Sequence, residues 1–289
     1  MSLATDRHDV VVDIGGTAIL LRTHSEAFRT LLQDRYQHFL REPMSRQSAR
    51  DPLALDVELL PESGPVTPHE ELVVRHDGDR WQIVRGDFRA HWDAVRGHGT
   101  ITQTLSPFAI DSVLRVVHSL IQAPRGGFLL HGASAIRNGR AFLFSGVSGA
   151  GKTTISRLAP PDATILTDEI SYIRRLEASD GAQNETSQRH GRPVYEAFGT
   201  PFAGELARIG ANGRAPIAHL FFLTQGPENR IDPIPTSDAL RMLLRNILFF
   251  ADDSKLVEMV FRSACEFVDH VPTSRLTFLP DQRVWELIQ

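Results

Sequence analysis

Short runs of apolar residues, separated by turn-forming residues, dominate the first part of the chain and predict strands. The runs Val10–Ile14 and Ala18–Arg22 flank Gly15-Gly16, a pair typical of a hairpin turn. After Ser25 the apolar residues recur at helical spacing up to about Leu40, which predicts a helix capped by the serine. Further strands are expected at Leu53–Leu59, Glu71–Arg75, Trp81–Arg85 and Thr100–Thr104, with a hairpin turn at Asp77-Gly78. This pattern predicts a small N-terminal α+β lobe.

The pattern changes after a predicted helix from about Phe108 to Gln122. The apolar runs Phe128–Ile136 and Arg140–Ser145 flank Asn138-Gly139, which predicts another hairpin. Later runs predict strands at Ala163–Thr167, Pro193–Phe198, Ile217–Leu223, Arg275–Leu279 and Val284–Ile288, and helices over Thr236–Phe250 and Asp252–His270. Strands and helices therefore alternate in the second part of the chain, as expected for an α/β fold.

The change of pattern predicts two domains, an N-terminal lobe over residues 1–124 and an α/β domain over residues 125–289. The chain has 289 residues, of which 42% are hydrophobic and 23% are charged, as in ordinary globular proteins. A formal net charge of −4 gives no indication of nucleic-acid binding, and no apolar run is long enough to cross a membrane. The single Cys265 excludes an internal disulfide. We expect a cytoplasmic protein that binds neither nucleic acid nor membranes.

One glycine-rich stretch indicates a specific chemistry. Residues 146–153 read Gly-Val-Ser-Gly-Ala-Gly-Lys-Thr, which matches the phosphate-binding P-loop. Backbone N–H groups of such a loop surround the phosphates of a nucleotide, Lys152 reaches the β- and γ-phosphates, and the Thr153 hydroxyl is placed for Mg²⁺. The predicted strand before the loop and helix after it supply the required context. The residues expected to hold ATP are Gly146, Val147, Ser148, Gly149, Ala150, Gly151, Lys152, Thr153 and Thr154.

Two acids, Asp168 and Glu169, end the next predicted strand. An acid at the C-terminal end of the strand after a P-loop is placed to hold Mg²⁺ or to orient the attacking group. The sequence therefore predicts that both acids lie near the phosphates.

Four features between about Phe128 and His219 resemble the HPr kinase/phosphorylase family, which shares its core with the ATP-dependent phosphoenolpyruvate carboxykinases. They are Leu130-His131-Gly132 on a strand before the P-loop, the P-loop itself, the pair Asp168-Glu169, and Arg214 just before the apolar strand Ile217–Leu223. The resemblance implies a P-loop kinase core that uses ATP and Mg²⁺ to phosphorylate a serine hydroxyl. The N-terminal lobe shows no such resemblance, and we expect it to help hold the acceptor.

The resemblance also implies a role for each residue. Asp168 would be the base, Glu169 and Thr153 would hold the metal, His131 would lie beside the base, and Arg214 would neutralise the transferred phosphoryl group. A further family glutamate has two candidates here, Glu196 and Glu205, and the spacing to Arg214 favours Glu196 as the additional metal-site acid.

The stretch from Phe198 to Glu205 looks more like small relatives of HPr kinase from peptide-modification clusters than like HPr kinase itself, and the HPr-recognition segment is not evident. The expected acceptor is therefore a serine of a peptide or small protein. Hexamers occur in the HPr kinase family, so a homo-oligomer is an open expectation, as is the choice among ATP, GTP and pyrophosphate.

Two alternatives to a kinase remain. One is an ATP-binding accessory protein of a biosynthetic cluster without transferase activity, because Glu169 stands where the family usually has Asp. The other is a carboxykinase-like enzyme acting on a small organic acid, which would require a cationic cluster.

Overall fold

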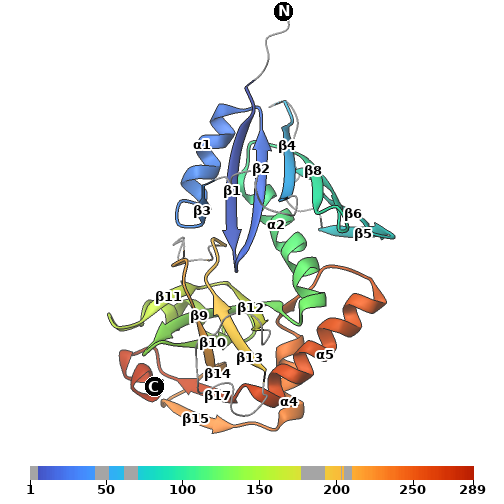
Figure 1. The fold of residues 1–289 in the computed structure, drawn as a ribbon. Helices are drawn as coiled ribbons and strands as arrows, with labels where there is room; N and C mark the ends of the chain where they lie inside the picture. Colours follow the sequence, from blue (N-terminus) through green and yellow to red (C-terminus); the bar gives the residue numbers. More distant parts are fainter. Residues whose placement is uncertain (1–5, 43–51, 62–70, 177–192, 203, 205–209) are drawn as a thin grey trace, which may run out of the picture. The chain divides into compact units, whose positions relative to one another are not determined.

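The computed structural model describes residues 6–42, 52–61, 71–176, 193–202, 204 and 210–289. The chain divides into two compact units, and each is built on a large sheet (Figure 1). Unit 1 comprises Met1–Ile121 and Phe250–Ser254, and unit 2 comprises Gln122–Phe249 and Lys255–Gln289. The described residues thus form a mixed α/β protein with two large sheets and few helices, which confirms the predicted α/β class at this level.

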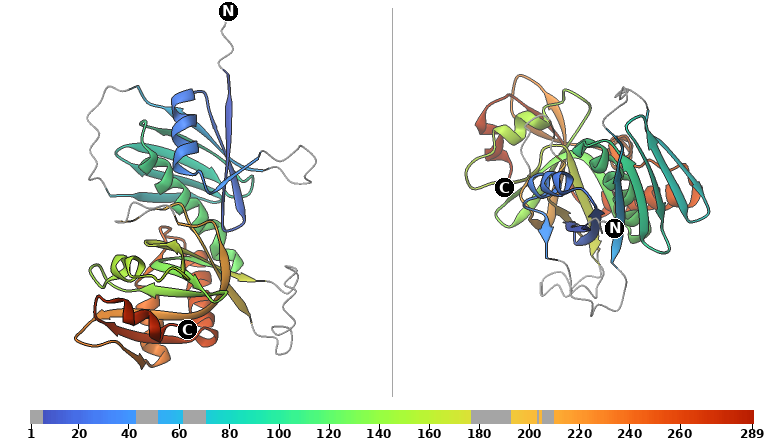
Figure 2. Two further views of the ribbon diagram at one scale, coloured as in Figure 1. Left: turned by 90° about the vertical axis from the view of Figure 1, so that its left-hand side faces the viewer. Right: turned by 90° about the horizontal axis from the view of Figure 1, so that it is seen from above.

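Unit 1 contains an eight-stranded sheet in the order β3-β1-β2-β4-β8-β7-β6-β5, which Figure 2 shows from two further sides. Its strands are β1 (His8–Ile14), β2 (Thr17–Thr23), β3 (Leu40–Arg41), β4 (Leu53–Leu59), β5 (Val73–Asp77), β6 (Arg80–Arg85), β7 (Phe88–Asp93) and β8 (His98–Gln103). The hairpins predicted at Gly15-Gly16 and Asp77-Gly78 are confirmed, because β1 pairs with β2 and β5 with β6. Strand β7 was not predicted from the sequence. Its buried Phe88, Ala90 and Trp92 alternate with exposed Arg89 and His91, as in a sheet with one covered face.

Two helices accompany the sheet of unit 1, α1 (Glu26–Arg35) and α2 (Pro107–Gln122). The predicted serine cap of α1 is confirmed, because the Ser25 hydroxyl oxygen accepts the Phe28 N–H at 3.2 Å. Asp111 of α2 accepts hydrogen bonds from Arg35 at 2.5 Å and from the Tyr36 hydroxyl at 2.6 Å. Burial and the neighbouring Asp111 charge raise the pKa of Tyr36 well above its usual value, so its hydroxyl remains a donor. This network ties α2 to the end of α1.

Unit 2 contains a nine-stranded sheet around β10 (Arg140–Ser145), the strand that leads into the P-loop. The other strands are β9 (Phe128–Arg137), β11 (Thr164–Thr167), β12 (Ile170–Leu176), β13 (Val194–Phe198), β14 (Arg214–Gln225), β15 (Arg230–Pro233), β16 (Ile247–Leu248) and β17 (Thr273–Phe278). β10 pairs antiparallel with β9 and parallel with β14. Because β9 also pairs with β12, β12 with β13 and β13 with β14, these five strands close into a ring.

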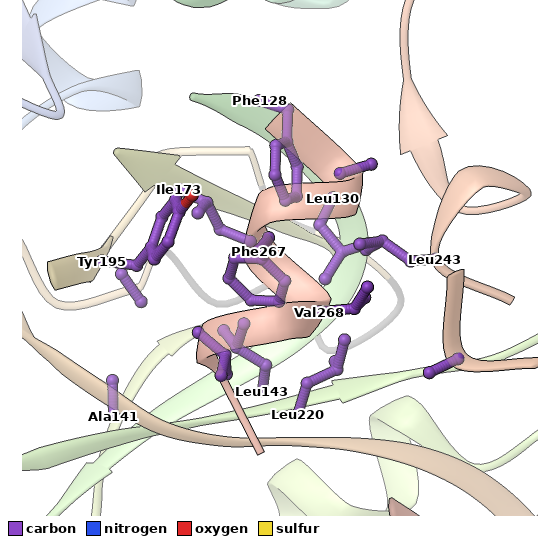
Figure 3. Close-up of a cluster of buried hydrophobic side chains, with 14 of the residues drawn as sticks. Phe128, Leu130, Ala141, Leu143, Ile173, Tyr195, Leu220, Leu243, Phe267 and Val268 are labelled. Carbon is purple, nitrogen blue, oxygen red and sulfur yellow. The ribbon is translucent and has the colours of Figure 1, made fainter. Parts of the chain in front are cut away.

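Two clusters of apolar side chains stabilise unit 2. In the first, Phe267 of α5 (Ser254–His270) lies among side chains of β9, β12 and β13 (Figure 3). Its ring meets those of Phe128 and Tyr195 edge-on, with centroids 5.4 Å and 5.0 Å away. α4 (Thr236–Leu244) packs on the same cluster through Ala239 and Leu243. The second cluster includes Ile155 of α3 (Lys152–Arg157) and Trp285 near the C-terminal end of the chain.

Several elements of unit 2 differ from the sequence predictions. The helix predicted over Thr236–Phe250 ends at Leu244, and β16 follows because residue 246 supplies its carbonyl to the backbone of β9. The strand predicted at Val284–Ile288 is wrong: Gln282–Leu287 forms a 3₁₀ helix, whose first turn is capped by Asp281 accepting the N–H of residue 283. Strands β12 and β15 were not predicted. No helix among the described residues is long and apolar enough to cross a membrane.

Candidate functional site

A cavity of about 410 Å³ lies where the P-loop follows β10. Side chains and backbone from five separate parts of unit 2 line it. They are Ser148, Gly149, Gly151, Lys152, Thr153 and Thr154 from the P-loop and α3, His131 from β9, Asp168, Glu169 and Gly204 from the turns after β11 and β13, and Gln225 at the end of β14. The cavity therefore brings the predicted phosphate-binding loop together with the predicted acids and the predicted histidine.

The P-loop keeps its curvature because two of its glycines adopt the left-handed backbone region, with φ of 78° at Gly149 and 108° at Gly151. A Cβ on Gly151 would lie only 2.6 Å from the ring of Phe278. The Lys152 ammonium donates to the carbonyls of Gly146 at 2.9 Å and Val147 at 3.3 Å, which holds it beneath the loop. These contacts give the loop a fixed shape and place a cation at the cavity wall.

Gln225 was not predicted as a site residue, although it contacts the P-loop directly. Its side-chain amide donates to the Gly149 carbonyl at 2.7 Å. β14 runs parallel to β10, so the C-terminal ends of the two strands meet at the same edge of the sheet. Gln225, two residues beyond the predicted strand Ile217–Leu223, was thus a candidate that the strand order could have indicated.

A pair of buried threonines fixes the turn that carries the two acids. The Thr167 hydroxyl oxygen accepts the N–H groups of Glu169 and Ile170, both at 3.2 Å. The Thr200 hydroxyl donates to the Ile170 carbonyl at 2.7 Å. Because both threonines are fully buried, these bonds are shielded from competing water. These bonds hold the backbone of the acidic turn in one conformation.

Asp168 is buried at the cavity wall, and its carboxylate is oriented by backbone. Its Oδ1 accepts the N–H of Gly204 at 3.0 Å. A Cβ on Gly204 would lie 3.1 Å from Asp168 Oδ2 and 3.0 Å from the Cβ of Glu169, so only glycine fits there without displacing the acids. The segment after Phe198 therefore supplies a backbone donor, the Gly204 N–H, to the carboxylate. The sequence did not reveal this contact.

His131 is tied to the strand that precedes the P-loop. Ser145, the last residue of β10, donates its hydroxyl to the His131 carbonyl at 2.9 Å. The His131 N–H donates to the carbonyl of Asn246 at 2.7 Å. In the register of β9 and β12, His131 lies opposite Ile170, which directly follows the acidic pair. These contacts hold the histidine at a fixed distance from both the P-loop and the acids.

The remaining predicted site residues lie elsewhere or do not line the cavity. Gly146, Val147 and Ala150 belong to the loop but are not part of the cavity wall. Arg214 and Glu196 form an ion pair with each other, with 3.8 Å between Nη1 and Oε2, and neither lines the cavity. Glu205 lies outside the described residues.

The oxygen donors at the cavity fit magnesium. The described residues contain no group of three or more His, Cys, Asp or Glu that could hold a metal by themselves. Magnesium usually takes only one or two carboxylates from the protein and completes its shell with phosphate oxygens and water. Thr153, Asp168 and Glu169 line one cavity and supply such donors. The residues present are therefore suited to Mg²⁺ bound together with a nucleotide.

Comparison with known proteins gives one family. Residues 99–289 match the family described as SynChlorMet cassette protein ScmC. No curated protein matches the chain. The matched residues include the whole of unit 2 and with it every residue that lines the cavity. Because the match spans well over half of the chain, the protein belongs to the ScmC family of SynChlorMet cassette proteins.

Proposed function

We propose that the protein is an ATP- and Mg²⁺-dependent phosphotransferase of the HPr-kinase-like type, acting on a serine hydroxyl of a peptide or small protein. One observation carries this proposal: Lys152 and Thr153 of a P-loop line the same cavity as Asp168, which comes from a different strand. Phosphoryl transfer needs a phosphate-binding side and a side that orients the attacking hydroxyl, and this cavity has candidates for both.

The donor side consists of the P-loop. Its backbone N–H groups and Lys152 would bind the phosphates of ATP, and the Thr153 hydroxyl would hold the metal together with Glu169. Bound Mg²⁺ would supply neutralisation of the phosphate charge. Gln225 keeps the loop in shape through its bond to Gly149.

The acceptor side consists of Asp168 and His131. The Asp168 carboxylate, oriented by the Gly204 N–H, would accept the proton of the serine hydroxyl as the serine oxygen bonds to the γ-phosphorus and the bond to the β-phosphate oxygen breaks. His131 borders the same space and would help to position the transferred group. ADP and a phosphoserine are the products.

The composition of the cavity wall bears on the alternatives. Lys152 is the one Lys or Arg among the described lining residues, so a cationic cluster for a small dicarboxylate finds no support there. An ATP-binding accessory protein would share the P-loop but would not need a buried carboxylate that backbone orients into the cavity. The kinase uses both features. We propose the cytoplasm, where ATP and Mg²⁺ are abundant, as its place of action.

The test is phosphoryl transfer from γ-labelled ATP with Mg²⁺ to free serine, to serine peptides and to lysate of the source cell. Wild type is compared with Asp168→Asn and with Asp238→Asn, a matched control on the exposed side of α4. We expect label on an acceptor with wild type and the control but not with Asp168→Asn. ATP binding without transfer to any acceptor would favour the accessory protein, and equal transfer by Asp168→Asn would exclude the proposed base.

A further inference from the structure

We propose that Ser145 and Ser171 are positioning residues for the transfer reaction. Their hydroxyls bond the backbone of one dipeptide, His131-Gly132, and together they set the separation between the P-loop and the acidic pair. We call these two hydrogen bonds the serine clamp. The proposal rests on the proposed function, because it assumes that ATP and Mg²⁺ bind to the P-loop and the acidic pair together.

The dipeptide lies directly between the P-loop and the acidic pair. In the sheet of unit 2, β9 lies between β10 and β12 (Figure 1). On one side of β9, Gly132 is opposite Ser145, the residue that precedes the P-loop. On the other side, the Gly132 N–H donates to the Glu169 carbonyl at 2.8 Å. Neighbouring strands lie about 4.8 Å apart, so about 10 Å separates the backbones of Ser145 and Glu169.

The serine clamp holds this dipeptide from both sides. The Ser145 hydroxyl donates to the His131 carbonyl at 2.9 Å, and the Ser171 hydroxyl donates to the Gly132 carbonyl at 2.8 Å. The carbonyls of successive strand residues point towards opposite neighbours, so one hydroxyl acts from β10 and the other from β12. Both serines are fully buried, and water therefore does not compete for the two carbonyls.

The Ser171 hydroxyl takes the place of a backbone donor. Glu169 accepts the Gly132 N–H, and in a regular antiparallel ladder it would return its own N–H to the Gly132 carbonyl. The Glu169 N–H donates instead to the Thr167 hydroxyl at 3.2 Å, within the acidic turn. A buried carbonyl without a partner costs free energy, and Gly132 is buried. The bond from Ser171 therefore allows the acidic turn and the sheet to form together.

Glycine at position 132 lets β9 and β10 lie close together at the clamp. A Cβ on this residue would lie 3.0 Å from the Phe144 carbonyl oxygen and 3.4 Å from the Cβ of Ser145. The neighbouring residue, His131, lines the cavity. The dipeptide that the clamp holds thus connects three parts of the site, which are the strand before the P-loop, the acidic pair and the histidine.

The separation matters because one magnesium ion must contact both sides. In the proposed function, Thr153 on the P-loop side and Glu169 on the acid side hold the same ion. Magnesium demands near-ideal octahedral geometry with ligand distances of about 2.0–2.1 Å, so its site tolerates little change in the separation. Transfer also falls by about 10² when the reacting groups are displaced by about 1 Å. Loss of either clamp bond should therefore weaken Mg²⁺-dependent binding and slow transfer, while the P-loop still binds phosphates.

The first test measures how much Mg²⁺ strengthens nucleotide binding. The dissociation constant of a fluorescent ATP analogue is determined with Mg²⁺ and with EDTA, for wild type, Ser145→Ala and Ser171→Ala. We expect the strengthening by Mg²⁺ to fall by about tenfold in both variants, and Ser171→Ala to bind the metal-free analogue within about twofold of wild type. Ser134→Ala is the matched control and should behave as wild type. It removes a buried hydroxyl of β9 that has no hydrogen-bond partner among the described residues.

The second test measures transfer from γ-labelled ATP. The kcat should fall by about 10–100-fold in both clamp variants, whereas the KM for the acceptor should stay within about threefold of wild type. Amide hydrogen exchange without nucleotide supplies a readout that does not depend on activity. The segment that contains His131 and Gly132 should exchange faster in the clamp variants than in Ser134→Ala. If the alanine variants do not fold, Ser145→Cys and Ser171→Cys keep a side chain of similar size with a weaker donor and should show losses in the same direction.

Wild-type values of the Mg²⁺ strengthening and of kcat in both clamp variants would overturn the proposal. An equal loss in Ser134→Ala would also overturn it, because the effect would then follow from any change in the buried part of β9. If wild type binds ATP with Mg²⁺ but transfers nothing, the proposed kinase is contradicted and the binding test alone decides on the clamp. Failure of ATP to bind to wild type would contradict the proposed function and the role of the clamp together.

Discussion

Two charged clusters in unit 2 differ in how they are held. In the cavity cluster, Asp168 is buried and accepts a backbone N–H, and Lys152 is buried and donates to backbone carbonyls. The second cluster, here called the arginine cluster, consists of Arg174, Arg214 and Glu196 around Phe198. Its Arg214 is largely exposed and is held by a 3.8 Å ion pair to Glu196 and by contact with the Phe198 ring. Backbone contacts hold a side chain in one position, whereas an exposed side chain keeps more conformational freedom. The first arrangement suits a catalytic site, which needs fixed geometry.

The largest difference between the clusters should appear when their acids are neutralised. Asp168→Asn removes the group that accepts the serine proton, and we expect transfer to free serine to fall by about 10²–10⁴. Glu196→Gln changes an acid that does not line the cavity, and the rate should stay within about threefold of wild type. Steady-state rates with γ-labelled ATP measure both. A comparable loss in Glu196→Gln would place that acid in the metal site, as the resemblance to HPr kinase predicts.

Substitutions of two P-loop glycines should separate the cost of backbone strain from the cost of a steric clash. Gly151→Ala would place a Cβ 2.6 Å from the Phe278 ring in a backbone conformation that favours glycine. We expect the free energy of unfolding to fall by about 2–4 kcal/mol and ATP binding to be lost. Gly149→Ala has the same kind of backbone but no atom within 4 Å of the new Cβ, so only about 1–2 kcal/mol should be lost. Urea unfolding measures both. Equal losses would show that collision with Phe278 is relieved by movement of the ring.

β14 connects the two clusters, with Arg214 at its first residue and Gln225 at its last, and His219 lies between them. Burial lowers the pKa of His219 from 6.5 to about 4, and its ring stacks on Phe221 with centroids 4.1 Å apart. The unfolded chain therefore binds a proton between these pH values and the folded chain does not. The contribution of His219 to the free energy of unfolding is therefore fully present above pH 6.5 and is lost as the pH falls to about 4.

We expect this loss to amount to about 1–2 kcal/mol once the partial exposure of His219 is taken into account. His219→Gln should flatten the dependence of the melting temperature on pH between 6.5 and 4. His270→Gln, at the exposed end of α5, serves as the matched control and should leave the slope unchanged. If His219→Gln keeps the full slope, other groups titrate in this range and the buried histidine is not its source.

Most residues of the cavity cluster could be predicted from the sequence because they lie close together along the chain. The glycine pattern, the strand before it and the short helix after it are contiguous, and the acids follow one strand later. The resemblance added His131, which also lines the cavity. Gly204 and Gln225 escaped prediction because they reach Asp168 and Gly149 across 36 and 76 positions of the chain, and only the strand order brings them there.

The position of Arg214 shows what spacing along the chain cannot predict. Spacing along the chain placed it a few residues before an apolar strand, and that strand is present as β14. Spacing does not tell which end of a strand lies at the P-loop, and β14 runs parallel to β10, so its last residues lie there and its first do not. The helix that replaces the predicted strand Val284–Ile288 likewise depends on Asp281 as its cap and on buried Trp285, neither of which apolar spacing reveals.

The smallest expected effect concerns stability in the arginine cluster. Arg214→Gln removes an exposed ion pair and a ring contact, so the free energy of unfolding should change by less than about 1 kcal/mol. Phe198→Ala removes the buried ring that both arginines share, and should cost about 3–5 kcal/mol. Urea unfolding compares the two. A cost for Arg214→Gln near that of Phe198→Ala would mean that the arginine supports the fold in spite of its exposure.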